Sequence, residues 1–407
     1  MQSKRNAVKA LAVGLVLALI PISVNAAQKV TAGATCKVLN QKVPYLNKTY
    51  TCIKSGKKLV WNKGVSIPQA TPIPTPTLTP ITKPTPTPTP SAIPTPSPSA
   101  TTPTPPSTFD DLVSHASGIA YSAWKKSKDQ ISASQSVLGK PTILIGPNTT
   151  LNYPSPLTAF NLASTLYSSS KQVKNIYAIY YSFKDINWAQ KTFDSLQDNP
   201  GNGNSSAAIH NCQTSATCWG ASTSVNAAGD GLMLIAVGLI DPNHTSGSLE
   251  AHEYTHTIQM IQAPQGGYGT LPRWLLEGQA EWSQAAATYS SNYSDYLKER
   301  RNNTNVLFNN SSLYTATWIA TFLNPNPVSD WAYWSTYENW RLYDIGSLAT
   351  EALVALKSPA AVMNLYTNVG KGQTFTQAFN TEFGISWADA VPILASAIAA
   401  ELKQGNK

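Results

Sequence analysis

The sequence predicts an α+β domain over residues 108–407, in which a first part that contains strands leads into a second part that is almost wholly helical. Short apolar stretches at 142–145 and 175–182 predict strands, and the apolar run 231–240 predicts a third, buried or at a sheet edge. After this run, apolar residues recur at helical spacing. Strands followed by helices are typical of α+β folds, and we expect the chemistry near the crossover.

Four long helices are predicted in the second part from this helical periodicity. They cover residues 246–262, 272–289, 340–357 and 387–403. Two earlier segments, 110–126 and 186–196, also predict helices. The segment 212–231 is rich in Ser, Thr, Ala and Asn, which predicts loops and short strands.

The N-terminus has the layout of a secretory signal. Three basic residues precede an apolar run over 10–24, and small residues lead up to Ala26, so we expect residues 1–26 to be cleaved. An uncleaved anchor is the alternative, but the run is shorter than the roughly 20 residues that span a bilayer, and Pro21 interrupts it. No later stretch reaches that length. We therefore expect a secreted, extracellular protein, free or associated with the cell wall, without a membrane span after cleavage.

The formal net charge of +8 belongs to the N-terminal part of the chain. Residues 1–107 hold 12 Lys and Arg and no acid, whereas residues 108–407 hold 17 basic and 21 acidic residues. A nucleic-acid partner is therefore not expected for the larger domain. Residues 68–107 hold 15 of the 29 prolines, mostly in Thr-Pro repeats, and predict an extended, semi-rigid linker.

Residues 27–67, with eight lysines and no acid, predict a small β module. The four cysteines form two local pairs, Cys36 with Cys52 and Cys212 with Cys218, and an oxidising compartment favours a disulfide in each. A zinc knuckle is the alternative, but neither pair has CxxC spacing. The lysines suit contact with a cell wall or an anionic glycan, and a solubilising spacer is the competing interpretation.

The motif His252-Glu-Tyr-Thr-His256 lies within the predicted helix 246–262. Residues four apart project from one face of a helix, so both imidazoles can bind a single zinc ion, Zn²⁺. Glu253 follows the first ligand, where its carboxylate can take a proton from a zinc-activated water and pass it to a leaving amine. The motif therefore predicts a catalytic zinc site.

The predicted helix 272–289 supplies two further carboxylates. Because a catalytic zinc ion takes three protein ligands, Glu277 is the predicted third ligand. Glu281 lies one turn further on, and we expect it to accept the free ring N–H of a zinc-binding histidine. The flanking Trp274 and Trp282 indicate a half-buried helix, in which carboxylates without a cation are costly.

The sequence over these two helices resembles the gluzincin clan of zinc metallopeptidases, which includes thermolysin and the zinc aminopeptidases. The resemblance lies in the HExxH motif and in a glutamate that follows it after twenty residues, within the pattern Trp-Leu-x-Glu-Gly-x-Ala. The resemblance is concentrated over 249–346. It implies a gluzincin-like fold, peptide or protein substrates, and the ligand and base roles given above. It also implies that Tyr343, in a Tyr-x-x-Gly segment 66 residues beyond Glu277, stabilises the oxyanion as the corresponding tyrosine of zinc aminopeptidases does.

The chain departs from the zinc aminopeptidases in one segment. It has no Gly-x-Met-Glu-Asn segment of the kind that binds a substrate's free amine, and the run 231–240 in that place has no acid over 232–239. This run is expected instead to pair with an extended peptide by strand addition, as gluzincin edge strands do. Endopeptidase action is at least as well supported as aminopeptidase action.

Two alternatives to a metallopeptidase stay open at this point. The first is a cell-surface binding protein in which residues 27–67 carry adhesion and the metallopeptidase-like domain is inactive. The second keeps the zinc ion but hydrolyses a substrate that is not a peptide. The presence of all the expected metal-site residues favours the peptidase over the first alternative.

Overall fold

The computed structural model describes residues 31–36, 42–45, 48–56, 58–66, 103–197, 206–238, 240, 242–264, 266–324 and 340–405. The predicted signal peptide, 1–26, and most of the predicted linker, 68–107, lie outside these residues. The chain forms two compact units, Met1–Thr95 and Pro96–Lys407.

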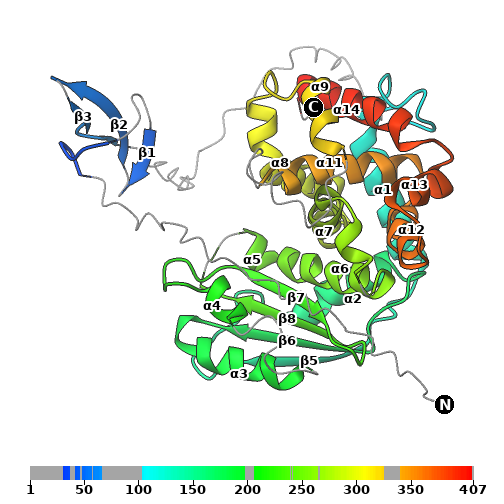
Figure 1. Ribbon diagram of the computed structural model, residues 1–407, viewed down its shortest axis with the longest axis horizontal. Coiled ribbons are helices and arrows are strands. Elements are labelled where there is room, and N and C mark those ends of the chain that lie inside the picture. Colours follow the sequence, from blue (N-terminus) through cyan, green and yellow to red (C-terminus); the bar gives the residue numbers. More distant parts are fainter. Residues whose placement is uncertain are drawn as a thin grey trace, which may run out of the picture. The chain divides into compact units, whose positions relative to one another are not determined.

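The first unit contains a small antiparallel sheet (Figure 1). Its strands are β1 (Lys42–Tyr45), β2 (Lys48–Ser55), β3 (Lys58–Trp61) and β4 (Val65–Ser66). Strand β2 pairs with each of the other three. Buried Cys52 and Trp61 form the core, and the disulfide between Cys36 and Cys52 ties the segment before β1 to β2. The predicted disulfide and the predicted β structure of the module are therefore confirmed.

The second unit begins with helices interleaved with strands, and among the described residues it continues with helices alone (Figure 1). The interleaved elements are α1 (Ile119–Ala133), β5 (Lys140–Ile145), α2 (Pro156–Leu166), β6 (Asn175–Tyr181), α3 (Ile186–Leu196), α4 (Ala207–Asn211), β7 (Ala221–Val225) and β8 (Gly231–Ala236). The helices that follow are α5 (Pro242–Ser246), α6 (Ser248–Gln262), α7 (Arg273–Thr288), α8 (Tyr293–Asn309), α9 (Ala316–Leu323), α11 (Arg341–Leu356), α12 (Pro359–Gly370), α13 (Phe375–Phe383) and α14 (Trp387–Gln404).

The mixed α+β class is confirmed, with two differences in its elements. Helices α2, α4, α5, α8, α9, α12 and α13 were not predicted. The helix predicted over 110–126 begins only at Ile119, because the carboxylate of Asp111 accepts hydrogen bonds from the backbone N–H groups of Ser107 and Thr108 and forms a turn instead. Within the described part of the chain, no single helix is long and apolar enough to cross a membrane, although two sharply bent helix pairs meet the same test together.

The sheet of the second unit has the strand order β5-β6-β8-β7. Strands β5, β6 and β8 are parallel, and β7 runs antiparallel to β8 at the edge. Every residue of β8 is buried, because Met233 and Ile235 face the core on the side of α2 and α6, while Leu232 and Leu234 face α3 and α4. The expectation that the run 231–240 pairs with a peptide is wrong, since β6 and β7 flank β8 on both sides.

Helices α7 and α11 contact each other backbone to backbone at two glycines. A Cβ atom on Gly278 would lie 2.1 Å from the carbonyl carbon of Gly346, and a Cβ atom on Gly346 would lie 2.2 Å from the carbonyl oxygen of Trp274. Neither position has room for a side chain. Because Glu277 and Tyr343 lie within one turn of this crossing, the close approach brings them to the same place.

A buried charge cluster joins α8, α11 and α14. Arg300 binds Glu351 at 2.7 Å and Glu401 at 3.1 Å, and all three side chains are buried. One guanidinium faces two carboxyl groups, so ionising both of them would leave one negative charge over. Burial and the charge of Glu351 raise the pKa of Glu401 to about 8, against the opposing effect of Arg300.

The crossing of α7 and α11 predicts a cost for Gly278→Ala. The added methyl group has to push the helices apart, so we expect the free energy of unfolding to fall by about 1–3 kcal/mol, although alanine is the better helix former by about 1 kcal/mol. Urea unfolding measures this loss. Gly269→Ala is the control, because no atom lies within 4 Å of its added Cβ, and an equal effect of both substitutions would refute the explanation.

The buried cluster predicts a pH dependence of stability. In the folded protein Glu401 keeps its proton up to about pH 8, whereas the ordinary value is 4.5, so its stabilising contribution is complete below pH 4.5 and is lost as the pH rises through 8. As the pH rises from 4.5 to 8, the free energy of unfolding of the parent should fall by a few kcal/mol more than that of Glu401→Gln, which has no proton to lose at this position. This is the order of magnitude that the pKa shift of Glu401 implies. Urea unfolding at several pH values measures the difference, and parallel curves for the two proteins would contradict it.

Candidate metal centre

Helix α6 lies between the sheet and α7, so polar side chains on several of its faces are buried. It packs against α7 in the antiparallel sense, with His256 beside Glu277 and His252 beside Glu281. The exposed fractions of His252 and His256 are only 6% and 7%. The structure thus brings together the two histidines and two glutamates that the sequence predicted for the site.

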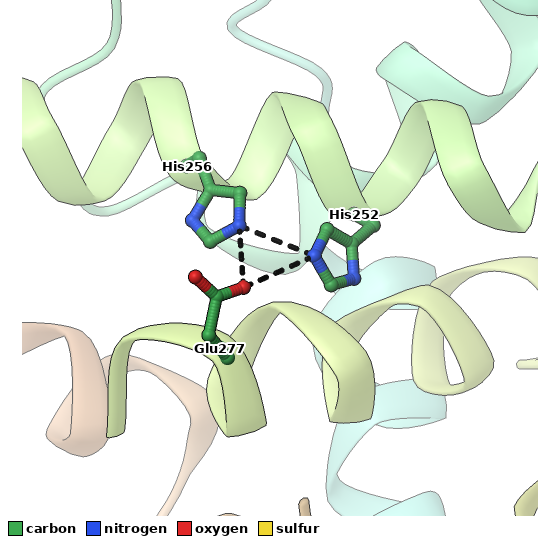
Figure 2. A group of neighbouring side chains, drawn as sticks. All are labelled: His252, His256 and Glu277. Carbon is green, nitrogen blue, oxygen red and sulfur yellow. Dashed lines mark hydrogen bonds and ion pairs between the residues drawn. The ribbon is translucent and has the colours of Figure 1, made fainter. Parts of the chain in front are cut away.

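Three ligand atoms meet between the two helices, as Figure 2 shows. The Nε2 atoms of His252 and His256 are 3.1 Å apart, and Oε2 of Glu277 lies 3.7 Å and 3.4 Å from them, respectively. Two ligands bound to a tetrahedral zinc ion at its usual bond lengths are about 3.3 Å apart. The donor set and its spacing therefore fit a metal ion held by two imidazoles and one carboxylate.

The electrostatics of the three side chains favour opposite charges in close contact. Burial disfavours a charged imidazole, but the neighbouring carboxylates of Glu277 and Glu281 outweigh it and raise the pKa of His252 to about 10. Burial likewise disfavours the carboxylate of Glu277, yet His256 and His252 hold its pKa well below the ordinary value. The pocket is therefore built to keep a carboxylate ionised beside a cation.

The outer ring nitrogens of the two histidines have different partners. Nδ1 of His252 lies 3.5 Å from Oε2 of Glu281, the residue predicted for this contact. Nδ1 of His256 lies 2.8 Å from Oε1 of Gln259, which the sequence analysis did not identify. The sequence signal for this contact is spacing, because Gln259 follows His256 by three residues and side chains three apart on a helix are neighbours.

Glu253, the predicted base, lies beside the edge strand β7. The hydroxyl of Thr223 on this strand donates a hydrogen bond of 2.5 Å to Oε2 of Glu253. Glu253 also lines the same cleft as His252. The edge strand therefore fixes one carboxylate oxygen of the predicted base.

Tyr343, the predicted oxyanion donor, lies on α11 against the metal centre. Its ring stacks on the ring of His252, with centroids 6.0 Å apart. The negative charge of Glu277, followed by burial and the charges of Glu253 and Glu281, raises the pKa of Tyr343 well above its ordinary range. The hydroxyl thus keeps its proton and can donate a hydrogen bond, which in this structure goes to Glu277.

A cleft of about 780 Å³ opens onto His252, Glu253 and Tyr343. It is lined by His210, Asn211, Gln213, Thr217, Trp219, Gly220, Ala221, Asn243, His244, Leu249, His252, Glu253, Glu281, Gln284, Asn302, Asn303, Trp340, Tyr343 and Asp344. Trp219 and Trp340 stack with centroids 6.5 Å apart, and Trp340 continues to Tyr343 at 5.6 Å. A row of aromatic rings therefore forms one wall and ends at the metal centre.

The second predicted disulfide holds part of this wall. Cys212 and Cys218 are bonded, which confirms the prediction. The backbone carbonyl of Trp219, the next residue, lies 3.1 Å from Nε2 of His244. No local pattern in the sequence pairs Trp219 or Thr223 with the motif helix, because both reach the site through the sheet and the disulfide loop.

Comparison with known proteins adds no relative. The chain matches no protein-family model, no curated protein and no solved structure. The interpretation of the site therefore rests on its own residues and their geometry.

The metal centre predicts a loss of zinc on Glu277→Ala. The parent should bind close to one equivalent of zinc, and the variant much less, because two imidazoles alone leave the ion with two protein ligands. Zinc bound per purified chain, measured by mass spectrometry of the metal, tests this. Glu250→Gln is the control, since Glu250 is buried on α6, the helix of both histidines, but contacts Tyr180 rather than the ligand atoms. Equal zinc in the parent and Glu277→Ala would exclude Glu277 as a ligand.

Proposed function

We propose that this chain is a secreted zinc-dependent metallopeptidase, with a catalytic domain of the gluzincin type. The observation that carries the proposal is the convergence of His252, His256 and Glu277 at the spacing of zinc ligands. Glu253 and Tyr343 flank this group and line the same cleft. The two disulfides are compatible with an extracellular location.

In this proposal His252, His256 and Glu277 hold the zinc ion. When bound, zinc supplies a Lewis acid that polarises a carbonyl and lowers the pKa of water. Glu253 takes the proton of the attacking water and delivers it to the leaving nitrogen. Thr223 holds one oxygen of that carboxylate, so the other oxygen is available for the proton.

Tyr343 is proposed to stabilise the negative charge that develops on the substrate's carbonyl oxygen. As the scissile carbonyl becomes tetrahedral, its oxygen gains negative charge, and the protonated hydroxyl of Tyr343 donates a hydrogen bond to it. The stacking of the Tyr343 ring on His252 fixes the ring before the substrate arrives. Such preorganisation lowers the barrier because the ring does not have to move during the reaction, and only the hydroxyl hydrogen turns from Glu277 to the oxyanion.

An extended peptide fits the edge strand β7 better than the interior strand β8. Within the described sheet, β7 pairs only with β8, so its other edge is available for strand addition. Thr223 on β7 contacts Glu253, which places this edge directly beside the proposed base. A peptide or protein substrate paired with β7 therefore runs past the catalytic group.

The small N-terminal module is proposed as the part that retains the protein at the cell wall. Lys54, Lys58 and Lys63 are exposed in its sheet region, and no acidic residue occurs over 27–67. This charge suits an anionic wall polymer or glycan.

Retention on isolated cell walls, compared with a chain that lacks 27–67, tests the proposal, and equal retention would refute it. Retention without hydrolysis would favour a binding protein with an inactive peptidase-like domain.

The proposed base predicts the effect of Glu253→Gln. Loss of general-base catalysis should lower turnover of a peptide library by about 10²–10⁴-fold while the zinc content stays the same. Mass spectrometry of the cleaved library gives the rate, and its new termini distinguish endopeptidase from aminopeptidase action. Asp129→Asn, an exposed carboxylate on α1, is the control. Full activity of Glu253→Gln would overturn the assignment.

The role of Tyr343 predicts a separate kinetic signature. Because its hydrogen bond strengthens only in the transition state, Tyr343→Phe should lower kcat by roughly 10–10³-fold and leave KM almost unchanged. Steady-state kinetics on one cleaved peptide measure both constants. A higher KM with an unchanged kcat would instead show that Tyr343 only binds the substrate.

A further inference from the structure

Gln259 contacts the metal centre without contributing a ligand. It lies on α6 three residues beyond His256, and its Oε1 atom is 2.8 Å from Nδ1 of that ring. Its side chain has no exposed surface. A buried amide in this place needs a partner for each of its polar atoms, and those partners determine which way round the amide lies.

The backbone of α7 fixes the orientation of this amide. Nε2 of Gln259 lies 3.0 Å from the carbonyl oxygen of Leu276, and a carbonyl oxygen only accepts hydrogen bonds. The nitrogen end of the amide therefore points to Leu276, and the oxygen end points to His256. The second N–H of Gln259 is donated to Oε1 of Gln279 at 3.1 Å, so the opposite orientation would break two buried hydrogen bonds.

A closed hydrogen-bond network holds Gln279 in turn. Its Nε2 atom donates to the hydroxyl of Tyr167 at 3.1 Å, and that hydroxyl lies 2.6 Å from Oγ of Ser283. Ser283 donates to the backbone carbonyl of Gln279. All of these side chains are fully buried. The direction of each hydrogen bond is therefore set by protein groups and not by exchanging water.

From this network we infer that Gln259 is a positioning residue that locks His256 in its Nδ1–H tautomer and so presents the lone pair of Nε2 to the metal. An amide oxygen only accepts, so the hydrogen between Gln259 and His256 belongs to Nδ1. In the neutral ring, Nε2, which faces His252 and Glu277, is then left without a hydrogen. The use of this lone pair as a ligand rests on the proposed function, whereas the tautomer itself does not.

The competing partner of Nδ1 is more distant. The hydroxyl of Tyr268 lies 3.5 Å from Nδ1 of His256, compared with 2.8 Å for Gln259. A hydroxyl can donate, which would favour the opposite tautomer, but hydrogen bonds weaken strongly at such a separation. The shorter contact therefore determines where the hydrogen lies.

A neutral amide in this place has a consequence for the charge of the site. His252 already has a carboxylate, Glu281, beside its Nδ1 atom, and Glu277 supplies a second one. Gln259 orients His256 without adding a third negative charge to the site. A neutral amide therefore fixes the ring of His256 without the desolvation penalty that a further carboxylate would add.

The first experiment measures the tautomer in the full chain without metal. Long-range ¹H–¹⁵N spectra of ¹⁵N-histidine-labelled protein are recorded at about pH 8, above the ordinary pKa of histidine. The chain has 5 histidines, and the signals of His256 are assigned by their loss in His256→Asn. We expect a protonated Nδ1 and an unprotonated Nε2. The reverse pattern would overturn the inference, whether or not the protein binds zinc or cleaves peptides.

The second experiment separates positioning from packing. Gln259→Met removes the contact with His256. Gln190→Met is the control, because it removes a buried glutamine of α3 that bonds Asp194 and the backbone of Ala208 and takes no part in the network around Gln259. Zinc affinity, measured by competition with a chromophoric chelator, should fall about 10–100-fold in Gln259→Met and by less than about threefold in Gln190→Met.

Equal losses in both variants, or no loss in either, would refute a positioning role for Gln259. Gln259→Glu is a further test, because it keeps an acceptor for Nδ1 but removes the donor to Leu276; it should retain the tautomer and more of the zinc affinity than Gln259→Met. A parent that binds no zinc but shows the expected tautomer would refute the proposed function and the ligand role of Nε2, and leave the orienting contact established.

Discussion

The need to pair the polar side chains buried on α6 is the constraint on which the rest of the large unit depends. This helix is covered by the sheet and by α7, yet it carries Glu250, His252, Glu253, His256 and Gln259 in buried positions. Unpaired polar groups in such places cost several kcal/mol each. The neighbouring elements therefore have to supply partners, and the partners from α7 and β7 are the ones that define the site.

The close crossing of α7 and α11 follows from the same requirement. Tyr343 reaches His252 only because Gly278 and Gly346 let the two backbones touch. A normal side chain at either position would separate the helices and withdraw the hydroxyl from the carboxylate of Glu277. The glycines therefore connect the packing of the helical half to the chemistry of the metal centre, and they explain why both acidic and aromatic groups converge there.

The sequence predicted those features that depend on local spacing. Helix α3 was predicted with its observed bounds, and helices α6, α7, α11 and α14 agree within two residues, because each has a clear apolar periodicity. The spacing of His252 and His256 was sufficient to place both rings on one face. The predicted pairing of β8 with a peptide substrate, by contrast, was wrong. The apolar sequence of a strand does not indicate which strands lie on either side of it. Thr223 was missed for a similar reason, as its contact with Glu253 exists only once β7 has joined the sheet.

The charges around His252 suit a divalent metal ion, as the proposed function requires. The pKa of about 10 means that the ring holds a proton at neutral pH, so a metal ion must displace it. This displacement costs on the order of 4 kcal/mol at pH 7. Structural zinc sites in small domains bind with roughly 10–16 kcal/mol at that pH, which exceeds the cost. The same carboxylates that hold the proton stabilise the dication more strongly, because it carries twice the charge. A pair of half-buried carboxylates beside two imidazoles is therefore more fully compensated by a divalent cation than by a single proton.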